Sequence, residues 1–300
     1  MKIVVTGSCG FLGSRIVASL RERGDEVIGI HARASCESRE TTSCLDIHYG
    51  SPVEVEPALK NTDILIHLAG TSTPFESMQN PKVAIMQDLI PSLALFESAV
   101  ETKVRKILFA STGGAMYGNL VSGYKAKESD LAIPSSPYGN IKLLLEKYLD
   151  EITRDSETSH ISLRLSNAYG PGQLARPNFG VIPNFISQIE AGEPLSVRAK
   201  ESTRDYIFVD DVISAFKSAL EYEGNYKVFN IGTGLPTSLE ALIRILEKYL
   251  TKKAIMEDVE QAQFPVTHSC LSVELAKSEM GWKPQITLDS GLRKTLARIS

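Results

Sequence analysis

Metal-binding patterns are absent from this sequence of 300 residues. Its four cysteines form no C-x-x-C pair, and its five histidines are scattered along the chain without the spacing of metal ligands. We therefore predict no metal site and expect the cysteines to be free thiols.

The sequence also lacks a run of basic residues, and its formal net charge is -4. This composition gives no indication of a nucleic-acid or polybasic membrane surface. No apolar run reaches the roughly 20 residues that span a membrane, and the opening run MKIVVTG reads as a strand and not as a secretory signal. We expect a cytoplasmic protein that binds neither nucleic acid nor membranes.

Glycine is concentrated where the first predicted strand, KIVVTG, meets the first predicted helix, FLGSRIVASLRERG. Gly7, Gly10 and Gly13 follow one another in the spacing G-x-x-G-x-x-G. Glycines permit a tight turn and a close approach of the backbone, and a helix N-terminus offers unpaired N–H groups to a pyrophosphate. A turn in this context predicts a dinucleotide site, although a glycine pattern alone also occurs at simple strand–helix corners.

The rest of the chain continues the alternation of apolar strands and helices. Further strands are predicted at EVIGIHA, TDILIHLAG, KILFAST and ISLRLSNAYG, and Pro91 predicts a kink or break in the long helix between the middle two. We predict an α/β fold, a Rossmann-type doubly wound parallel sheet, with a dinucleotide-binding domain over residues 1–166. After Pro171 the sequence becomes rich in Pro, Gly and Asn. Residues 167–300 are predicted to form a smaller C-terminal substrate-binding lobe, partly interleaved with the sheet.

The end of the second strand separates NAD sites from NADP sites. NAD sites place an acidic residue there for the ribose hydroxyls, whereas this chain reads GIHARAS. Arg33 is available to meet a 2′-phosphate, although it can equally face solvent. We predict NADP as the cofactor, with NAD as the alternative. Asp46, in the run CLDI, is predicted to cap the adenine amine, with a surface carboxylate as the alternative, and Ile47 is predicted to bind the cofactor.

Tyr138 and Lys142 lie four residues apart in SPYGNIKLLLEKYL, and this spacing places them on one face of a helix. A phenol is a poor base near neutral pH because its ordinary pKa is about 10. An ammonium group beside it favours the phenolate, so we expect Lys142 to lower the pKa of Tyr138. The pair can then remove a proton from a sugar hydroxyl or return one.

Taken in order, these motifs resemble the extended short-chain dehydrogenase/reductase family, and within it the nucleotide-sugar epimerase/dehydratase branch. The resemblance covers nearly the whole chain. It rests on TGSCGFLG, ILIHLAG, FASTGGAMYG, SPYGNIK, LRLSNAYGPG, RDYIFVDD, FNIGTG and GWKP.

The resemblance implies a role for each motif. Tyr138 would be the catalytic acid/base, and Lys142 would bind the nicotinamide ribose and tune the phenol. Asn167 and Arg204 would bind the nucleotide-sugar near its phosphates. The cofactor would be held along its pyrophosphate by Gly7, Gly10, Phe11, Leu12, Gly13, Leu68, Ala69 and Gly70.

The chain departs from the family pattern beside the catalytic tyrosine. Gly113 stands where the family usually has Ser or Thr, so Thr112 or Ser111 must supply the hydroxyl, and we favour Thr112. Dehydratases place an Asp–Glu pair immediately after that hydroxyl, whereas this chain has glycine, which argues against a dehydratase. Asp88 replaces a common Asn of the fourth helix.

The sequence therefore predicts a 4-epimerase that acts on a nucleoside-diphosphate hexose by transient oxidation at C4. The alternative is an NADPH-dependent reductase of 4-keto-6-deoxy nucleotide-sugars. A third hypothesis is a non-catalytic NADP-binding sensor on the same fold. The resemblance also implies a homodimer formed by the helices near residues 85–102 and 138–153.

Overall fold

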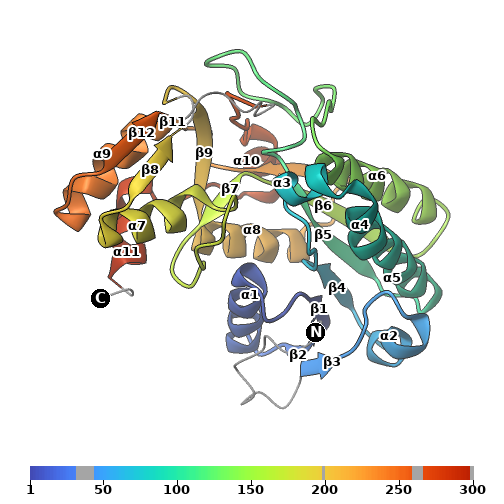
Figure 1. The fold of residues 1–300 in the computed structure, drawn as a ribbon. Helices are drawn as coiled ribbons and strands as arrows, with labels where there is room; N and C mark the ends of the chain where they lie inside the picture. Colours follow the sequence, from blue (N-terminus) through green and yellow to red (C-terminus); the bar gives the residue numbers. More distant parts are fainter. Residues whose placement is uncertain (32–43, 198–199, 259–265, 298–300) are drawn as a thin grey trace. The chain divides into compact units, whose positions relative to one another are not determined.

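The computed structural model describes residues 1–31, 44–197, 200–258 and 266–297 (Figure 1). The chain forms two compact units whose segments alternate along the sequence. The first unit comprises Met1–Thr112, Ser136–Arg164 and Ile213–Phe229, and the second comprises Gly113–Ser135, Leu165–Val212 and Asn230–Ser300. The functional division at residue 166 stays a prediction.

The described residues contain a seven-stranded sheet in the order β10-β6-β5-β4-β1-β2-β3. Neighbouring strands from β3 to β5 pair in parallel, which confirms the predicted Rossmann-type sheet. The strands are β1 (Lys2–Thr6), β2 (Glu26–His31), β3 (Cys44–Asp46), β4 (Ile64–His67), β5 (Lys106–Thr112), β6 (Ser159–Leu165) and β10 (Val228–Ile231). The strand order reverses direction between β1 and β4, and ligands of such sheets bind at the carboxyl ends of the strands beside that point.

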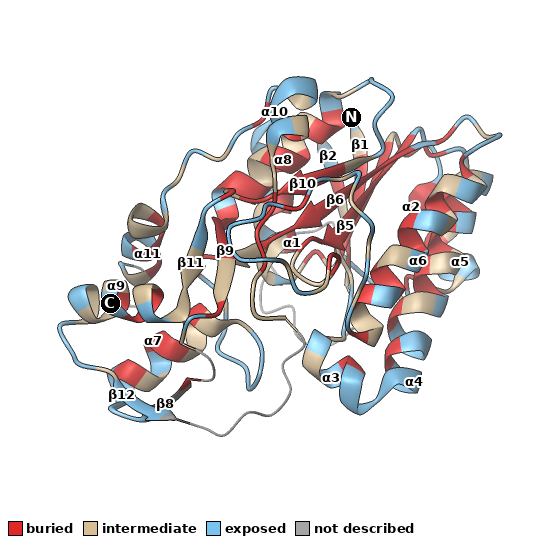
Figure 2. Cartoon of the chain, turned by 90° about the horizontal axis from the view of Figure 1, so that it is seen from above, coloured by how far each residue is buried: buried red, intermediate tan, exposed pale blue. Residues whose placement is uncertain are grey.

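Helices cover both faces of this sheet. Figure 2 shows α2, α5 and α6 on one face and α1 and α8 on the other. The helices are α1 (Phe11–Glu22), α2 (Pro52–Leu59), α3 (Pro74–Gln79), α4 (Pro81–Ala84), the π-helix η1 (Ile85–Leu89), α5 (Ile90–Glu101), α6 (Pro137–Ile152) and α8 (Val209–Glu221). Strands β4 and β5 are buried along their whole length, because a sheet covered on both faces leaves neither side of a strand exposed.

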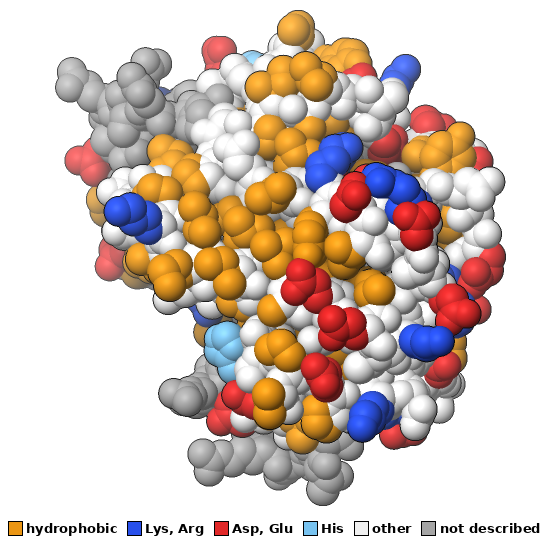
Figure 3. Space-filling model, turned by 90° about the vertical axis from the view of Figure 1, so that its right-hand side faces the viewer, with side chains coloured by type: hydrophobic (Ala, Val, Ile, Leu, Met, Phe, Trp, Pro, Cys, Tyr) orange, Lys and Arg blue, Asp and Glu red, His pale blue; other side chains and the backbone are white. Residues whose placement is uncertain are grey.

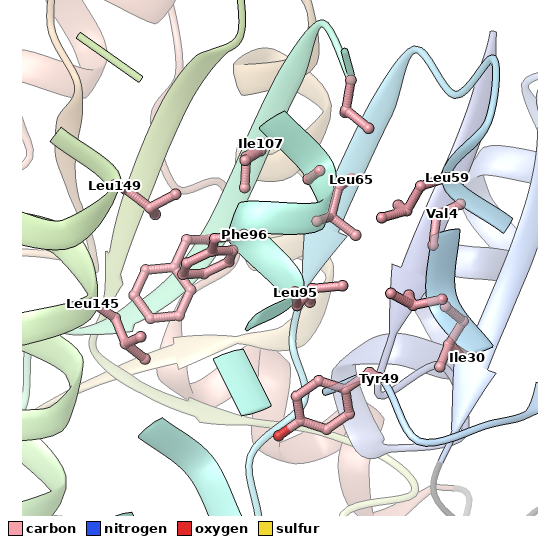
Figure 4. Close-up of a cluster of buried hydrophobic side chains, with 14 of the residues drawn as sticks. Val4, Ile30, Tyr49, Leu59, Leu65, Leu95, Phe96, Ile107, Leu145 and Leu149 are labelled. Atoms are coloured by element: carbon pink, nitrogen blue, oxygen red, sulfur yellow. The ribbon is translucent and has the colours of Figure 1, made fainter. Parts of the chain in front are cut away.

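The core of the first unit lies between the sheet and α2, α5 and α6 (Figure 4). Side chains from β1, β4 and β5, such as Val4, Leu65 and Ile107, meet Phe96 of α5 and Leu145 of α6 there, and all five are almost fully buried. Burying a side chain of this size stabilises a fold by about 1.5–3 kcal/mol. The apolar faces of the helices therefore fix their positions over the sheet.

The helical run through α4, η1 and α5 is irregular at the predicted proline. Pro91 lies in the first turn of α5, directly after the π-helix, so the predicted break is confirmed. Proline has no N–H to give to the carbonyl of Gln87 four residues earlier. That carbonyl instead accepts the hydroxyl of Tyr49 at 3.2 Å.

The same run, Pro81–Glu101, is long and apolar enough to span a membrane by length and composition alone. The expectation that no run reaches this length was therefore wrong. Leu95, Phe96 and Ala99 of the run are fully buried in the core cluster, and we assign it to the core of the first unit.

The second unit holds two small sheets. Strand β9 (Thr203–Phe208) pairs with β7 (Asn167–Tyr169) in parallel and with β11 (Pro236–Ser238) in antiparallel. Strands β8 (Pro194–Val197) and β12 (Ile255–Asp258) pair in parallel. The helices are α7 (Val181–Ala191), α9 (Leu239–Leu250), α10 (Glu274–Met280) and α11 (Leu288–Leu296).

A buried carboxylate ties the second unit together. Asp205, on β9, is fully buried and accepts the backbone N–H groups of Thr233 at 2.8 Å, Gly234 at 3.0 Å and Leu271 at 3.3 Å. These bonds offset the cost of burying the carboxyl group and hold the segments after β10 and before α10 against β9.

A buried ion pair fastens α6 to the sheet. The guanidinium of Arg164, on β6, donates to both carboxylate oxygens of Glu146, on α6, at 2.6–3.2 Å. Both side chains are less than 10% exposed. Ser111 of β5 donates its hydroxyl to the same carboxylate, so three elements meet at one group.

We predict that Arg164→Met destabilises the fold by about 3–5 kcal/mol, because it leaves the Glu146 carboxylate buried without its partner. Chemical denaturation measures this change in the free energy of unfolding. Arg154→Met is the matched control, since it removes an exposed ion pair with Glu151 and is expected to have little effect. Equal effects of the two changes on the free energy of unfolding would contradict the stabilising role of the buried Arg164–Glu146 ion pair.

Candidate functional site

The glycine turn joins β1 to α1 through close backbone contacts. Gly7 has a φ of +70°, and the N–H of Gly10 donates to the Gly7 carbonyl at 3.0 Å. A Cβ built on Gly13 would lie 2.0 Å from the Gly7 oxygen, and one built on Gly7 would lie 3.0 Å from the Ala69 nitrogen. Side chains at Gly7 or Gly13 would therefore push α1 or the segment after β4 out of place.

The first turn of α1 has no side-chain cap, because its N-cap residue is Gly10. Backbone N–H groups in a first turn have no partner within the helix, and the helix dipole favours an anion beside them. The turn thus forms a cradle of backbone groups that fits a pyrophosphate. The structure brings together the predicted residues of this cradle: Gly7, Gly10, Phe11, Leu12 and Gly13.

Tyr138 and Lys142 lie on one face of α6, as predicted. Ser136 caps this helix, accepting the N–H of Gly139 at 3.2 Å. The Lys142 ammonium donates to the carbonyl of Ala110 at 2.9 Å, and its nitrogen lies 5.8 Å from the centroid of the Tyr138 ring. The pair therefore packs on the carboxyl end of β5.

The structure distinguishes between the two candidate hydroxyls. The side chain of Thr112 hydrogen-bonds the phenol of Tyr138. Ser111, the preceding residue of β5, donates to Glu146 instead, because successive side chains of a strand point to opposite faces. Thr112 is thus the hydroxyl beside the tyrosine, and Ser111 belongs to the ion pair that holds α6.

The electrostatics of the pair differ from the prediction. Burial and the nearby Asp88 carboxylate raise the pKa of Tyr138 to about 12, while the hydrogen bond from Thr112 lowers it. Burial also lowers the pKa of Lys142 to about 8. The expectation that Lys142 lowers the pKa of the phenol was wrong for the protein alone, since desolvation dominates and the ammonium is directed at a backbone carbonyl.

The segment after β4 connects the glycine turn with the lysine. Leu68 donates its N–H to the Thr6 carbonyl at 3.3 Å, and Ala69 donates to the Thr6 hydroxyl at 3.3 Å. A Cβ built on Gly70 would lie 4.0 Å from the Lys142 nitrogen. These three residues therefore lie between the predicted pyrophosphate cradle and Lys142.

Two of the residues predicted to bind the cofactor lie at the end of β3. Asp46 ends β3 and is exposed, with His31 of β2 as its register partner, and Ile47 follows it. Arg33, the predicted 2′-phosphate contact, lies outside the described residues. The assignments of these three residues stay predictions.

The predicted substrate residues Asn167 and Arg204 belong to the second unit. The Asn167 amide donates to the Asp205 carbonyl at 3.2 Å. The Arg204 guanidinium donates to the carbonyls of Thr203, Val266 and Thr267 at 2.8–3.1 Å. These bonds hold Arg204 in a defined position, and its predicted contact with phosphate stays a prediction.

Sequence reasoning missed three features of the first unit. Asp88, noted only as a departure from the family, is almost fully buried and acts electrostatically on both Tyr138 and Lys142. The Ser77 hydroxyl accepts the N–H of Tyr138 at 3.1 Å, and no sequence signal marks it. Cys9 is disulfide-bonded, so the expectation of free thiols was wrong there.

We predict that Gly13→Ala destabilises the first unit by more than about 1–3 kcal/mol, because its Cβ meets backbone atoms that cannot move aside. Thermal unfolding measures the loss. The control is Gly24→Ala, which has a φ of +91° but nothing within 4 Å of the added Cβ. That change adds backbone strain alone, of about 1–2 kcal/mol. A Gly13→Ala variant as stable as the wild type would contradict the close approach.

Comparisons with known proteins match the chain to one family. The profile of the NAD dependent epimerase/dehydratase family matches residues 3–232. A dTDP-4-dehydro-6-deoxyglucose reductase of Escherichia coli is 32% identical, and the alignment covers 99% of this chain and 97% of the relative. A UDP-glucose 4-epimerase of Mycolicibacterium smegmatis is 30% identical, with the same coverage.

Solved structures show the same fold. A UDP-glucose 4-epimerase of Thermotoga maritima, solved with UDP-glucose, has a TM-score of 0.92 and 32% identity, covering 100% of this chain and 98% of that one. The Thermus thermophilus UDP-glucose 4-epimerase, solved with NAD, has a TM-score of 0.92 and 28% identity, covering 99% and 98%. The chain is therefore an enzyme of the extended short-chain dehydrogenase/reductase type and belongs to the NAD-dependent epimerase/dehydratase family.

Proposed function

We propose that this protein is a nucleotide-sugar 4-epimerase that acts by transient oxidation at C4 of a nucleoside-diphosphate hexose. The observation that carries the proposal is the Tyr138 phenol, hydrogen-bonded to Thr112 at the carboxyl end of β5. Relatives named as UDP-glucose 4-epimerases over nearly the whole chain support it.

In this reaction Tyr138 removes the proton from the C4 hydroxyl and later returns it. Thr112 orients the phenol and hydrogen-bonds the reacting oxygen. A bound nicotinamide supplies a hydride acceptor and a positive charge beside the phenol. Gly113 and Gly114 stand where dehydratases of the family place an Asp–Glu pair, so these two positions do not supply the acid/base group that elimination of water requires.

A reductase of 4-keto-6-deoxy nucleotide-sugars is the second candidate. Because burial and Asp88 raise the pKa of Tyr138 to about 12, the phenol of the protein alone is protonated near neutral pH and is ready to act as an acid. Besides the hydride that NADPH supplies, reduction of a ketone needs only that proton donation, whereas epimerisation also needs Tyr138 to act as a base. The 32% identity to a dTDP-4-dehydro-6-deoxyglucose reductase also supports this second candidate function.

For the cofactor, we propose NADP, with NAD as the alternative. The absence of an acidic residue in GIHARAS supports NADP, because a carboxylate at that place would repel a 2′-phosphate. The structural relatives solved with NAD support the alternative. Comparison of the affinities for NADPH and NADH distinguishes the two.

For the substrate, we propose that Asn167 and Arg204 bind the diphosphate of the sugar. A guanidinium held by three carbonyls keeps further N–H groups for phosphate oxygens. Neighbours solved with UDP-glucose and UDP-glucuronic acid support a nucleoside-diphosphate sugar as the substrate class.

A panel of UDP-, GDP-, CDP- and dTDP-sugars, incubated with and without NADPH, tests the function. Interconversion of sugars without added cofactor is the expected result. If NADPH is consumed only when a 4-keto sugar is supplied, and no sugars are interconverted, the protein is a reductase and not an epimerase.

We predict that Tyr138→Phe lowers turnover at least about 100-fold, because it removes the proton donor and acceptor. The matched control is Tyr148→Phe, since Tyr148 lies on the same helix with its hydroxyl bonded to Glu97 and should be dispensable. A Tyr138→Phe variant that still binds NADPH and still performs the function of the wild-type protein in the cell would instead support a non-catalytic sensor.

We also propose that the protein is a homodimer. Exposed apolar side chains gather on the face shown in Figure 3. The exposed large apolar residues of α3, α4, η1, α5 and α6 are Met78, Val83, Ile85, Met86, Ile90 and Leu144. Both helical regions predicted to pair thus carry exposed apolar residues, and such a patch favours association. The partner would be a second copy related by two-fold symmetry.

Met86→Lys is expected to convert the dimer to a monomer, because it places a charge in the apolar patch. Analytical ultracentrifugation measures the mass. Val53→Lys, which changes an exposed apolar residue of α2, should leave the mass unchanged. A wild-type monomer at micromolar concentration would contradict the proposal.

A further inference from the structure

The second strand of the large sheet ends in a histidine that no step of the proposed reaction uses. His31 is the last residue of β2 and is half-buried. Its Nδ1 atom is buried and has no hydrogen-bond partner in the part of the chain that the structure describes. A buried polar atom without a partner is costly, and a ligand that forms a hydrogen bond there would satisfy it.

The side chain of His31 points to the face of the sheet that α1 covers. Ile28 and Ile30 pack into the core formed with α2, α5 and α6, on the opposite face (Figure 2). Because successive side chains of a strand alternate between faces, Gly29 and His31 share the face of α1. A Cβ built on Gly29 would lie 2.7 Å from the Ser8 hydroxyl oxygen, so the glycine turn lies directly against this face of β2.

The glycine turn is also bonded to the residue before His31. Ser8 donates its N–H and its hydroxyl to the Ile30 carbonyl, both at 3.2 Å. Ile30 is the register partner of Thr6, the residue before Gly7, and neighbouring strands lie about 4.8 Å apart. His31 therefore lies about one strand spacing from the start of the pyrophosphate cradle.

The end of β2 identifies the group that His31 replaces. NAD sites place an acidic residue at the end of the second strand, where it binds the ribose hydroxyls. The sequence alone does not show where in GIHARAS the strand ends, whereas the structure ends it at His31. The described acidic residue that the register places beside His31 is Asp46 of β3, one strand farther from the glycine turn. By strand order, an imidazole stands between Asp46 and the cradle, where NAD sites have a carboxylate.

We propose that His31 sets the cofactor preference of this site by donating a hydrogen bond to the 2′-phosphate of NADP. A neutral or cationic imidazole carries at least one N–H, whereas a carboxylate only accepts hydrogen bonds and would repel the phosphate. An imidazole at the end of β2 therefore reverses the preference that a carboxylate gives this position. The inference rests on the proposed function for the identity of the dinucleotide, but not on the turnover of a sugar.

Binding of NADP⁺ and NAD⁺, which differ only in the 2′-phosphate, tests the proposal without a sugar. Isothermal titration calorimetry of the full-length protein, freed of any copurified nucleotide, measures both dissociation constants. We expect the wild type to bind NADP⁺ more tightly than NAD⁺. His31→Ala should weaken the binding of NADP⁺ about 10- to 100-fold, the loss of one hydrogen bond to a charged group, and leave that of NAD⁺ nearly unchanged. A wild type that prefers NAD⁺, or an unchanged ratio in His31→Ala, would overturn the proposal.

His31→Asp sharpens the test, because it restores the carboxylate of an NAD site. This variant should prefer NAD⁺, and a retained preference for NADP⁺ would contradict the role of His31. His268→Asp is the matched control. It makes the same change in the second unit, where the Nδ1 of His268 lies 3.0 Å from the Thr203 hydroxyl. The control should keep the wild-type ratio, and a shift as large as that of His31→Asp would count against the proposal.

Arg33 is the rival contact for the 2′-phosphate, and it lies outside the described residues. If Arg33→Ala removes the preference for NADP⁺ and His31→Ala retains it, the inference is wrong. If His31→Ala does not fold, His31→Leu removes the same N–H groups and is read in the same way.

The panel of nucleotide-sugars tests the proposed activity separately. A protein that interconverts no sugar but loses its preference for NADP⁺ in His31→Ala would retain the role of His31 and lose the epimerase. A protein that interconverts sugars while His31→Ala keeps the wild-type ratio would do the reverse.

Discussion

The buried bond network between Glu146 of α6, Arg164 of β6 and Ser111 of β5 is the constraint on which the site depends. Tyr138 and Lys142 lie two turns and one turn before Glu146 on the same helix, so their positions follow from that attachment. Because a buried ion pair is costly to break from one side, α6 cannot slide or rotate on the sheet without a large loss of stability. The network thus supplies the rigidity that proton transfer requires.

The fold and most of the candidate site follow from local signals in the sequence. The glycine turn is recognisable because its spacing falls between a continuous apolar strand and an amphipathic helix, and the structure supplies the close contact of Gly13 with Gly7 that explains it. Tyr138 and Lys142 share a helix face by spacing alone. Pro91 marks the place where the helix becomes irregular. Because proline has no N–H to donate, the Gln87 carbonyl accepts the hydroxyl of Tyr49 instead.

The contacts that join distant segments could not be predicted. Thr112 and Ser111 are both hydroxyl residues of one strand, and only the packing of α6 decides which of them meets the tyrosine. The predicted sign of the Tyr138 pKa shift was wrong, since the sequence reveals neither how deeply the phenol is desolvated nor that Asp88 lies nearby. The length of the apolar run Pro81–Glu101 was misjudged because polar residues interrupt it in the sequence. Only the fold shows that its apolar residues lie on one continuous helical run, part of which packs into the core.

Epimerase and reductase share one chemical event, the transfer of hydride at C4 with proton transfer by Tyr138. The most direct measurement uses a nucleoside-diphosphate hexose that carries deuterium at C4, incubated with the protein and followed by nuclear magnetic resonance and mass spectrometry. Hydride transfer would leave the deuterium at C4 of the inverted sugar or in the nicotinamide, and this is the result that we expect. Loss of the deuterium to water would show that the hydrogen leaves as a proton, and the proposed chemistry would then be wrong.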